Sequence, residues 1–352
     1  MDRLRIGFVG AGYMGQLAHI ANYVGLPGVE LAALAEGRPQ LAEQVAARYG
    51  IRRVFPDHRA LLAEAEVEAV VAIMPFSLHH AVVPDLLAAG KHVLTEKPIT
   101  VQPESARKLA DQAAAQGLVY QVGYQKRSDP AAVYAKRLAE QWRESGECGA
   151  LRYLRASMPP GPWQMRIEPP IGTGEPFPSY PGETAEPPPA WMDEQTGKLF
   201  ISFINYYIHQ VNLMRYLLGE DYRIRYADPA GVTFTATSES GVPCVLEMSP
   251  YATRNHWVET YTLCFAQGYL ELSLPAPLAR QQCGRVRVFR GVGEHDSFEQ
   301  PVLPPLWQFA QQARNFAAAA SGQAPNIAPA AEAAKDLETA EEYLRVWLEA
   351  RG

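Results

Sequence analysis

Two short stretches of the sequence combine residue types that can move a proton. Lys97 lies in the tetrapeptide Thr95-Glu96-Lys97-Pro98, directly after a short apolar run. His209 follows Asn205 by four residues in a segment with a helical pattern, so the spacing places both side chains on one helical face. Lysine and histidine act as general acids or bases once their surroundings bring the pKa near neutrality. Both residues also have ordinary explanations, as a surface lysine before a proline and as a structural histidine.

A glycine-rich hexapeptide indicates where a nucleotide would bind. Gly10-Ala11-Gly12-Tyr13-Met14-Gly15 follows an apolar strand and opens a helix, which is the context of a dinucleotide-binding turn. In such a turn the first glycine permits the bend, the second lets the backbone approach a pyrophosphate, and the third allows helix–strand packing. Glu36 lies 21 residues beyond Gly15, where an acid hydrogen-bonds the adenosine ribose and repels a 2′-phosphate, so we expect NAD. Arg38 leaves NADP open as the alternative, because its guanidinium could hold that phosphate.

The elements that position these residues alternate between apolar strands and amphipathic helices. The predicted strands are Arg5–Gly10, Glu30–Glu36, Ala69–Ile73, His92–Thr95 and Val119–Gly123, and the helices between them are Gln40–Tyr49, Leu78–Ala89 and Glu104–Gln116. This alternation predicts a parallel sheet with helices on both faces, an α/β Rossmann domain over residues 1–125. Ligands bind beyond the carboxyl ends of such strands, where Lys97 follows the strand His92–Thr95.

The pattern changes after about residue 150. Strands are predicted at Leu151–Ser157, Gly231–Ser238, Val242–Ser249, Val258–Ala266, Tyr269–Leu274 and Arg285–Arg290, and helices at Lys198–Leu217, Trp307–Ala320 and Pro329–Ala350. Strands in series with glycine and proline turns are typical of a largely antiparallel sheet. We therefore predict an α+β domain over residues 126–352 for substrate binding and oligomerisation, with C-terminal helices that can pack back on the first domain.

A proline-rich segment, Met158–Trp191, separates the first strand of this second domain from the helix that follows. It holds 11 of the 29 prolines, a density that excludes helix interior and central strand. It also contains Trp163, Phe177, Tyr180 and Trp191, whereas disordered linkers are poor in aromatic residues. We expect an ordered loop over the active site of its own or a neighbouring subunit. The alternative is a solvent-exposed insertion.

Composition excludes several classes of partner and site. The formal net charge is −6 and no run of Lys and Arg stands out, which argues against nucleic acid and anionic membranes. The four cysteines form no C-x-x-C pair, so neither a metal site nor a redox dithiol is expected, and reduced thiols suit the cytoplasm. The N-terminus has no signal-peptide pattern, and no apolar run approaches the length of a membrane span.

Taken together, these motifs resemble the Gfo/Idh/MocA family of sugar and cyclitol oxidoreductases over nearly the whole chain. The resemblance rests on Gly10–Gly15, Pro75 and His79, Ala89-Gly90-Lys91-His92-Val93 leading into Glu96-Lys97-Pro98, Gly123-Tyr124-Gln125-Lys126-Arg127, and the His209 helix ending Leu217-Leu218-Gly219. It implies an NAD(P)-binding domain, a second domain with an open sheet, and a site lined by Lys97 and His209. Expected cofactor-binding residues are Gly10, Gly12, Tyr13, Met14, Gly15, Glu36, Arg38, Pro75, His79, Glu96, Lys97 and Gln125. Expected substrate-binding residues are Tyr124, Arg127, Tyr206 and Trp163.

The chain departs from the family pattern around the histidine. Asn205 and Asn212 stand where the family usually has aspartates, and Tyr207 stands where it usually has glycine. Asparagine cannot titrate, but it can hydrogen-bond a substrate hydroxyl. We therefore expect Lys97 as the general acid/base, with His209 assisting as a proton partner or hydrogen-bond donor and Asn205 beside it.

The function expected from these features is NAD(P)-dependent oxidation or reduction at a secondary alcohol of a sugar, cyclitol or glycoside, by a homodimer or homotetramer. Two alternatives use the same parts. One is NAD-assisted cleavage or elimination of a glycoside without net redox change. The other is a non-catalytic regulator that binds NAD(P) and a sugar.

Overall fold

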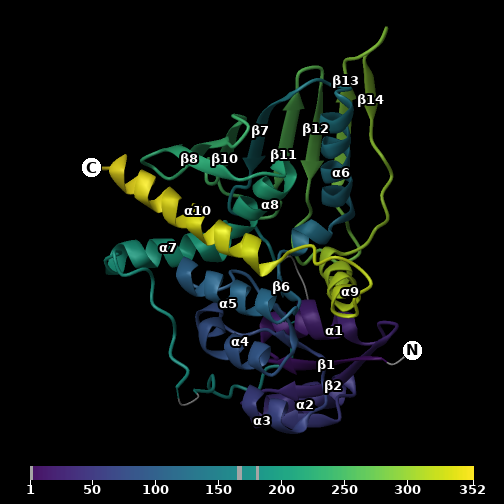
Figure 1. Ribbon diagram of the computed structural model, residues 1–352, viewed down its shortest axis with the longest axis vertical. Coiled ribbons are helices and arrows are strands. Elements are labelled where there is room, and N and C mark those ends of the chain that lie inside the picture. The colour runs from purple at the N-terminus through teal and green to yellow at the C-terminus, as the bar shows by residue number, and fades with distance from the viewer. Residues whose placement is uncertain (1–2, 165–168, 180–181) are drawn as a thin grey trace. The chain divides into compact units, whose positions relative to one another are not determined.

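The chain forms two compact units, each assembled from separate stretches of sequence (Figure 1). The computed structural model describes residues 3–164, 169–179 and 182–352. The first unit comprises Met1–Tyr124, Glu168–Asn205 and Phe309–Leu337. The second comprises Gln125–Ile167, Tyr206–Gln308 and Glu338–Gly352.

The first unit is built on a six-stranded parallel sheet with strand order β3-β2-β1-β4-β5-β6. Its strands are β1 (Leu4–Val9), β2 (Val29–Ala35), β3 (Arg53–Phe55), β4 (Ala69–Ala72), β5 (His92–Thr95) and β6 (Tyr120–Val122). Its helices are η1 (Gly15–Ile20), α1 (Ala21–Tyr23), α2 (Pro39–Tyr49), α3 (His58–Glu64), η2 (Phe76–Leu78), α4 (His79–Ala88), α5 (Pro103–Ala115) and most of α7 (Glu194–Tyr206) and α9 (Gln308–Ala320). The predicted Rossmann fold is confirmed. Strand order reverses between β1 and β4, the place where doubly wound sheets bind ligands.

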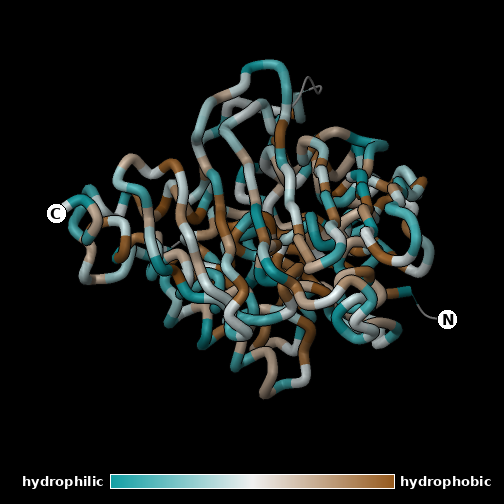
Figure 2. Tube along the Cα trace, turned by 90° about the horizontal axis from the view of Figure 1, so that it is seen from above, coloured by the Kyte–Doolittle hydropathy of each residue, from teal (hydrophilic) through white to brown (hydrophobic). Residues whose placement is uncertain are grey.

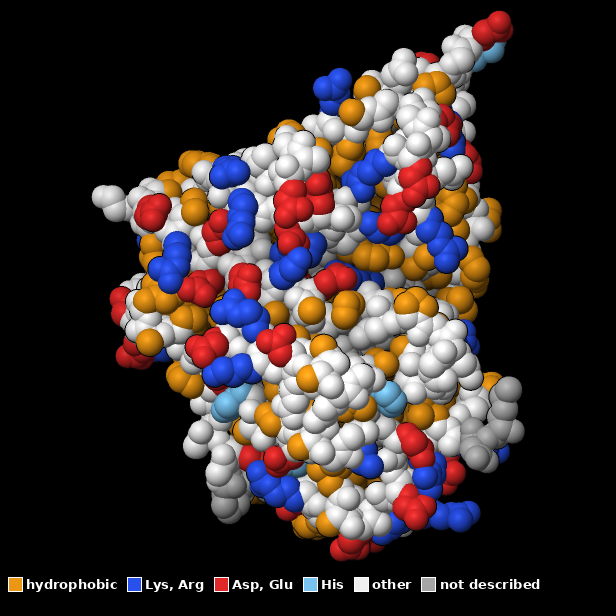
Figure 3. All heavy atoms as spheres, viewed as in Figure 1, with side chains coloured by type: hydrophobic (Ala, Val, Ile, Leu, Met, Phe, Trp, Pro, Cys, Tyr) orange, Lys and Arg blue, Asp and Glu red, His pale blue; other side chains and the backbone are white. Residues whose placement is uncertain are grey.

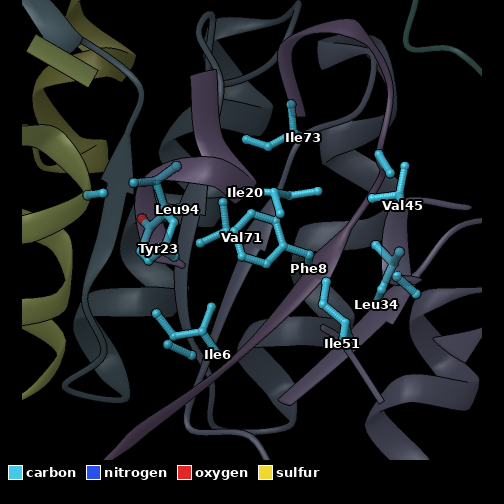
Figure 4. Packing of buried hydrophobic residues seen from close by; sticks show 14 of the residues in the cluster. Ile6, Phe8, Ile20, Tyr23, Leu34, Val45, Ile51, Val71, Ile73 and Leu94 are labelled. Atoms are coloured by element: carbon cyan, nitrogen blue, oxygen red, sulfur yellow. The ribbon is translucent and has the colours of Figure 1, made fainter. Parts of the chain in front are cut away.

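The core of this unit explains why its strands read as apolar runs. Both faces of a parallel sheet are covered, so strands such as β4 are buried along their whole length. Phe8 of β1 packs edge-on against Tyr23, with ring centroids 5.4 Å apart, among aliphatic side chains of η1 and the neighbouring strands (Figure 4). Phe316 of α9 belongs to the same buried cluster. A helix from the end of the chain therefore completes the core of the first unit.

The second unit carries an eight-stranded sheet with order β14-β13-β12-β11-β7-β10-β9-β8. Its strands are β7 (Leu151–Ser157), β8 (Tyr222–Ala227), β9 (Thr233–Ser238), β10 (Pro243–Glu247), β11 (Thr260–Phe265), β12 (Gly268–Ser273), β13 (Arg285–Arg290) and β14 (Ser297–Glu299). Within the described residues, every pairing of neighbouring strands in this sheet is antiparallel except that of β7 with β10. The predicted, mostly antiparallel sheet is confirmed.

One face of this sheet is buried and the other is more exposed. Alternate residues of β9 and β11 are buried. Figure 2 shows hydrophobic and hydrophilic residues alternating along many stretches of the chain trace. Helices η3 (Gln125–Ser128), α6 (Pro130–Ser145) and α8 (Ile208–Leu218) belong to this unit, and α10 (Ala330–Glu349) contributes its second part. Trp142 of α6 meets Phe265 of β11 edge-on, with ring centroids 5.1 Å apart.

On the face drawn in Figure 3, basic and acidic side chains lie interspersed.

The prediction of one helix over Lys198–Leu217 is wrong. The structure has two helices, α7 and α8, separated at Tyr207. At the start of the second helix, the Tyr207 carbonyl accepts the amides of Gln210 and Val211. The Tyr207 hydroxyl donates to the Met248 carbonyl at 2.6 Å. Asn205 and His209 therefore do not share one helical face, because the i,i+4 spacing holds only within an uninterrupted helix.

No helix in the described part of the chain combines the length and apolar character needed to cross a membrane.

Candidate functional site

The glycine-rich turn between β1 and η1 contains two glycines that the fold requires and one that leaves room for a ligand. Gly10 has φ +89°, and a Cβ there would lie 2.2 Å from the Ile73 carbonyl oxygen. A Cβ on Gly15 would lie 2.9 Å from the Gly10 carbonyl oxygen. A Cβ on Gly12 would meet only an Arg38 guanidinium nitrogen, at 3.8 Å. The surrounding protein would therefore accept a side chain at position 12. The open space beside Gly12 fits a bound pyrophosphate.

Glu36 and Arg38 form a tight pair just beyond the end of β2. The guanidinium of Arg38 donates to both carboxylate oxygens of Glu36, from Nε at 2.7 Å and from Nη2 at 2.8 Å. The Ala11 amide in the glycine-rich turn donates to the same carboxylate at 2.8 Å. Glu36, the residue predicted to read the adenosine ribose, is 5% exposed, and its carboxylate links the glycine-rich turn to Arg38. Arg38 is held by this acid rather than extended toward solvent.

The chain after β4 carries two predicted cofactor-binding residues in different surroundings, Pro75 before η2 and His79 at the start of α4. His79 is fully buried, and its Nδ1 lies 2.9 Å from the Ile99 carbonyl oxygen. Burial lowers the pKa of His79 to about 4, so the imidazole is neutral near pH 7 and Nδ1 donates to Ile99. In the structure His79 supports the chain after Pro98, and its predicted contact with cofactor stays a prediction.

Lys97 is fixed at the carboxyl end of β5 by its neighbours. Its ammonium donates to the Asn205 carbonyl at 2.5 Å, and its backbone amide donates to the Glu96 carboxylate at 3.2 Å. Glu96 in turn meets His19 Nε2 at 2.7 Å. Burial acts to raise the pKa of Glu96, but the hydrogen bond and charge of His19, with the charge of Lys97, bring it below its ordinary value. An ionised Glu96 therefore anchors the backbone that presents Lys97.

His19 is a residue of this cluster that the sequence did not reveal. It lies on η1, four residues after Gly15, and is 1% exposed. Its ring also packs edge-on against Phe309 at 5.6 Å. A histidine inside the glycine-rich helix has no special spacing, so its link to Glu96 appears only once β1 and β5 lie in one sheet. Gly123 closes the same corner, since a Cβ there would lie 3.1 Å from the Glu96 Cα.

Residues 169–179 and 182–191 of the proline-rich segment belong to the first unit and contact its helices and loops. Gln16 and Ile171 exchange two hydrogen bonds, at 2.9 and 3.0 Å, next to the glycine-rich turn. Arg38 lies over the ring of Phe177 at 5.6 Å. Glu186 accepts the amides of Val101 and Gln102 in the loop before α5. These residues are thus held beside the glycine-rich turn, and the predicted cover over an active site stays a proposal. Tyr180 lies outside the described residues.

The second unit holds the other predicted residues. Arg127 is 2% exposed, donates to the Asn212 side-chain oxygen at 2.7 Å, and lies over the ring of Tyr216. Asn212 is therefore the partner of an arginine. The Tyr206 hydroxyl accepts the Gly161 amide at 3.3 Å. His209 is half-buried on α8.

The remaining predicted residues differ in their burial and in the unit to which they belong. Tyr124 and Gln125 are buried, at 2% and 1% exposure, and Trp163 is half-buried in the second unit. Tyr13 and Met14 follow Gly12 in the turn, where Tyr13 is exposed and Met14 packs against the core cluster. Lys97 and Asn205 lie in the first unit and His209 in the second.

A buried charged cluster in the second unit was not predicted. Lys126 Nζ lies 2.5 Å from Glu259 Oε1, which also accepts from Gln210 at 2.8 Å and from the Tyr261 hydroxyl at 2.7 Å. Burial lowers the pKa of Lys126, and the nearby Glu259 carboxylate opposes that effect. Among the described residues, the Glu259 Oε2 and Gln210 Oε1 atoms have no hydrogen-bond partner. Each of these two buried oxygens can accept a hydrogen bond from a water molecule.

Metal chemistry has no candidate in this part of the chain. The described residues include no group of three or more His, Cys, Asp or Glu side chains placed to hold a metal ion.

The turn glycines give a paired test of their separate roles. Gly10→Ala should lower the free energy of unfolding by at least about 1–3 kcal/mol, because it forces a left-handed backbone conformation and a clash with Ile73. Gly12→Ala should leave stability within about 0.5 kcal/mol and weaken NAD binding by about tenfold or more. Urea unfolding without cofactor and calorimetric titration with NAD measure the two effects. Unchanged NAD affinity in Gly12→Ala would show that the cofactor does not approach this residue.

Comparison with known proteins places the site in context. Residues 4–124 match the model of an oxidoreductase family with an NAD-binding Rossmann fold, GFO_IDH_MocA. Scyllo-inositol 2-dehydrogenase (NAD(+)) of Bacillus subtilis is 28% identical over 222 residues, which cover 62% of this chain and 55% of that protein. UDP-N-acetylglucosamine 3-dehydrogenase of Acidithiobacillus ferrooxidans is 37% identical over 156 residues, which cover 44% of this chain and 45% of that protein. The chain thus spans about half the length of these curated relatives.

Solved structures extend the likeness to the whole fold. A putative NADPH-dependent oxidoreductase from Desulfitobacterium hafniense has a TM-score of 0.79 at 15% identity, and the match covers 100% of this chain and 97% of that one. Aldose-aldose oxidoreductase from Caulobacter crescentus has a TM-score of 0.73 at 19% identity, with 99% of each chain covered. At these identities the likeness shows the fold, including the second unit, and nothing of the substrate.

Proposed function

We propose that the protein is an NAD(P)-dependent oxidoreductase of the Gfo/Idh/MocA family acting on a secondary alcohol of a sugar, cyclitol or glycoside, because residues 4–124 match the model of that family. The observation that carries this proposal is the position of Lys97. A proton-transferring side chain stands at the carboxyl end of β5, one strand from the β1–β4 reversal at which such sheets bind ligands. The relatives named above act on inositol and on a nucleotide sugar, which supports the substrate class.

The glycine-rich turn fits a dinucleotide. The open space at Gly12 would admit the pyrophosphate against the backbone, and the start of η1 would supply free amides. Glu36 would face the adenosine ribose, with Arg38 beside it. When bound, NAD supplies the hydride chemistry of alcohol oxidation, and the protein must bind, orient and deprotonate the substrate.

Lys97 is the group proposed to take the hydroxyl proton during oxidation and to return it during reduction. The neutral amine is the base, and a neighbouring positive charge or burial favours that form by disfavouring the ammonium. The Asn205 carbonyl and the Glu96 anchor hold Lys97 in place for this transfer. His209 is proposed to assist as a hydrogen-bond donor or proton partner, and the Asn205 amide to contact a substrate hydroxyl.

A substrate panel tests the proposal directly. Inositols, free aldoses, glucosides and nucleotide sugars are incubated with NAD or NADP, and both cofactor reduction and substrate loss are measured. Equal amounts of reduced cofactor and oxidised sugar are expected for at least one compound. Cleavage of a glycoside without net cofactor change would indicate the NAD-assisted reaction instead. Binding of cofactor and sugar with no turnover of any compound would favour a regulator.

A further inference from the structure

Residues 169–179 and 182–191, named here the strap, run along the outside of the first unit before the chain enters α7. In Figure 1 this stretch passes the helices α3 and α4 on its way to α7. Three glutamates dock it: Glu175 on α2, Glu183 on α3 and Glu186 on the loop before α5. These acids hold the strap against two helices and one loop of the first unit.

Glu175 occupies the amino end of α2. Its two carboxylate oxygens accept the backbone amides of Gln40 at 3.1 Å and of Leu41 at 3.0 Å. The Thr173 hydroxyl donates to the same carboxylate at 2.6 Å. The free amides and partial positive charge of a helix amino terminus attract anions, and here a side chain of the protein satisfies both. Burial alone would raise the pKa of Glu175, but these hydrogen bonds and the charge of Arg38 bring it below its ordinary value, so the group is ionised near neutral pH.

The amino end of α2 is also where a 2′-phosphate would be expected. Glu36 marks the end of β2, the position that reads the adenosine ribose, and Arg38 is placed two residues later, just before the helix. A phosphate on that ribose would need an arginine and free helix amides. Glu36 holds the guanidinium of Arg38, and Glu175 holds the amides. Protein carboxylates thus take up both parts of a phosphate-binding site.

We propose that Glu175 is a cofactor-specificity residue, whose carboxylate fills the anion-binding end of α2 and thereby excludes the 2′-phosphate of NADP. The proposal rests on the proposed NAD(P)-dependent function and deepens it. It assigns selectivity for NAD to two acids from distant parts of the chain: Glu36 binds Arg38, and Glu175 binds the helix. NAD carries only a hydroxyl at the 2′ position, so Glu175 does not oppose it.

Dissociation constants of NAD and NADP for the wild type and Glu175→Gln test this inference. Glutamine is close in size and removes the charge, so the NADP constant should fall about tenfold or more while the NAD constant stays within about twofold. The affinity for adenosine 2′,5′-bisphosphate, which has the 2′-phosphate but no nicotinamide half, should rise by the same factor. Adding Arg38→Ala to Glu175→Gln should abolish the gain, because the released site then lacks its cation.

Glu183→Gln is the matched control. Glu183 also docks the strap, through Arg59 at 3.2 Å, but it contacts α3 and not the amino end of α2. This variant should leave the ratio of the two constants unchanged. An unchanged ratio in Glu175→Gln, or equal changes for NAD and NADP, would overturn the inference and leave Glu175 as a docking residue only. A wild-type protein that binds neither cofactor would overturn the proposed function itself.

Discussion

Replacing Lys97 by alanine should lower kcat by about 10²–10⁴-fold, the range expected when general acid/base action is removed. The loss follows from the position of the amine at the end of β5, where the Asn205 carbonyl accepts a hydrogen bond from it. The dissociation constant of NAD should change by no more than about threefold, since Gly12, Glu36 and the start of η1 are untouched. Initial rates with the substrate found in the panel, together with cofactor titration, measure both quantities.

Two further variants separate chemistry from charge. Lys97→Arg keeps a positive charge but cannot act as a base near neutral pH, so its kcat should be as low as that of Lys97→Ala. Lys91→Ala removes a lysine whose ammonium donates to the Val67 carbonyl at 2.9 Å in the same unit, and it should keep wild-type kcat. Wild-type turnover in Lys97→Ala would remove Lys97 from the mechanism.

Replacing Glu259 by alanine should lower the free energy of unfolding by about 3–5 kcal/mol, the usual result of leaving one partner of a buried ion pair unpaired. Lys126 and Glu259 are 3% and 2% exposed, so removing the carboxylate leaves a buried ammonium without its ionic partner. The Gln210 amide and the Tyr261 hydroxyl would also lose their acceptor. Urea denaturation, monitored by tryptophan fluorescence and circular dichroism, measures the change.

The double variant Lys126→Met/Glu259→Leu should recover most of that loss, because apolar side chains of similar size need no partner. Glu271→Ala serves as the control, since Glu271 pairs with Arg287 at 3.5 Å on a more exposed part of the sheet. That change should cost at most about 1 kcal/mol. If Glu259→Ala costs less than the control, or if the double variant is no more stable than the single one, the buried pair does not act as described.

Local pattern was sufficient for much of the fold. The strands His92–Thr95 and Leu151–Ser157 are predicted with the observed bounds, because apolar runs and alternating patterns record burial directly. The three-residue strands β3 and β14 are too short to carry a period and were not predicted. Helix α6 was also not predicted, although Asp129 caps it, Pro130 opens it and Gly146 closes it, so its signals were present in the sequence.

The site depended more on contacts between distant residues. Helical spacing predicted a shared face for Asn205 and His209, but the chain leaves the helix at Tyr207, where its carbonyl and hydroxyl make other bonds. Lys126 and Glu259 are separated by 133 positions, and nothing in either local sequence indicates the other. The glycine-rich turn and Lys97 could be found because their spacing along the chain is itself the motif.

The strand β6 depends on residues two hundred positions further along the chain, which limits how the NAD-binding unit can be exchanged between proteins. The Asn326 amide donates to the Tyr120 carbonyl at 2.9 Å, and the Val122 amide donates to the Ala328 carbonyl at 2.9 Å. Phe316 adds a side chain to the core. A chimera that contains only the first 124 residues would have an edge strand without its hydrogen-bond partners and a core without the Phe316 side chain. A transferable module needs the stretch that ends at Leu337 as well.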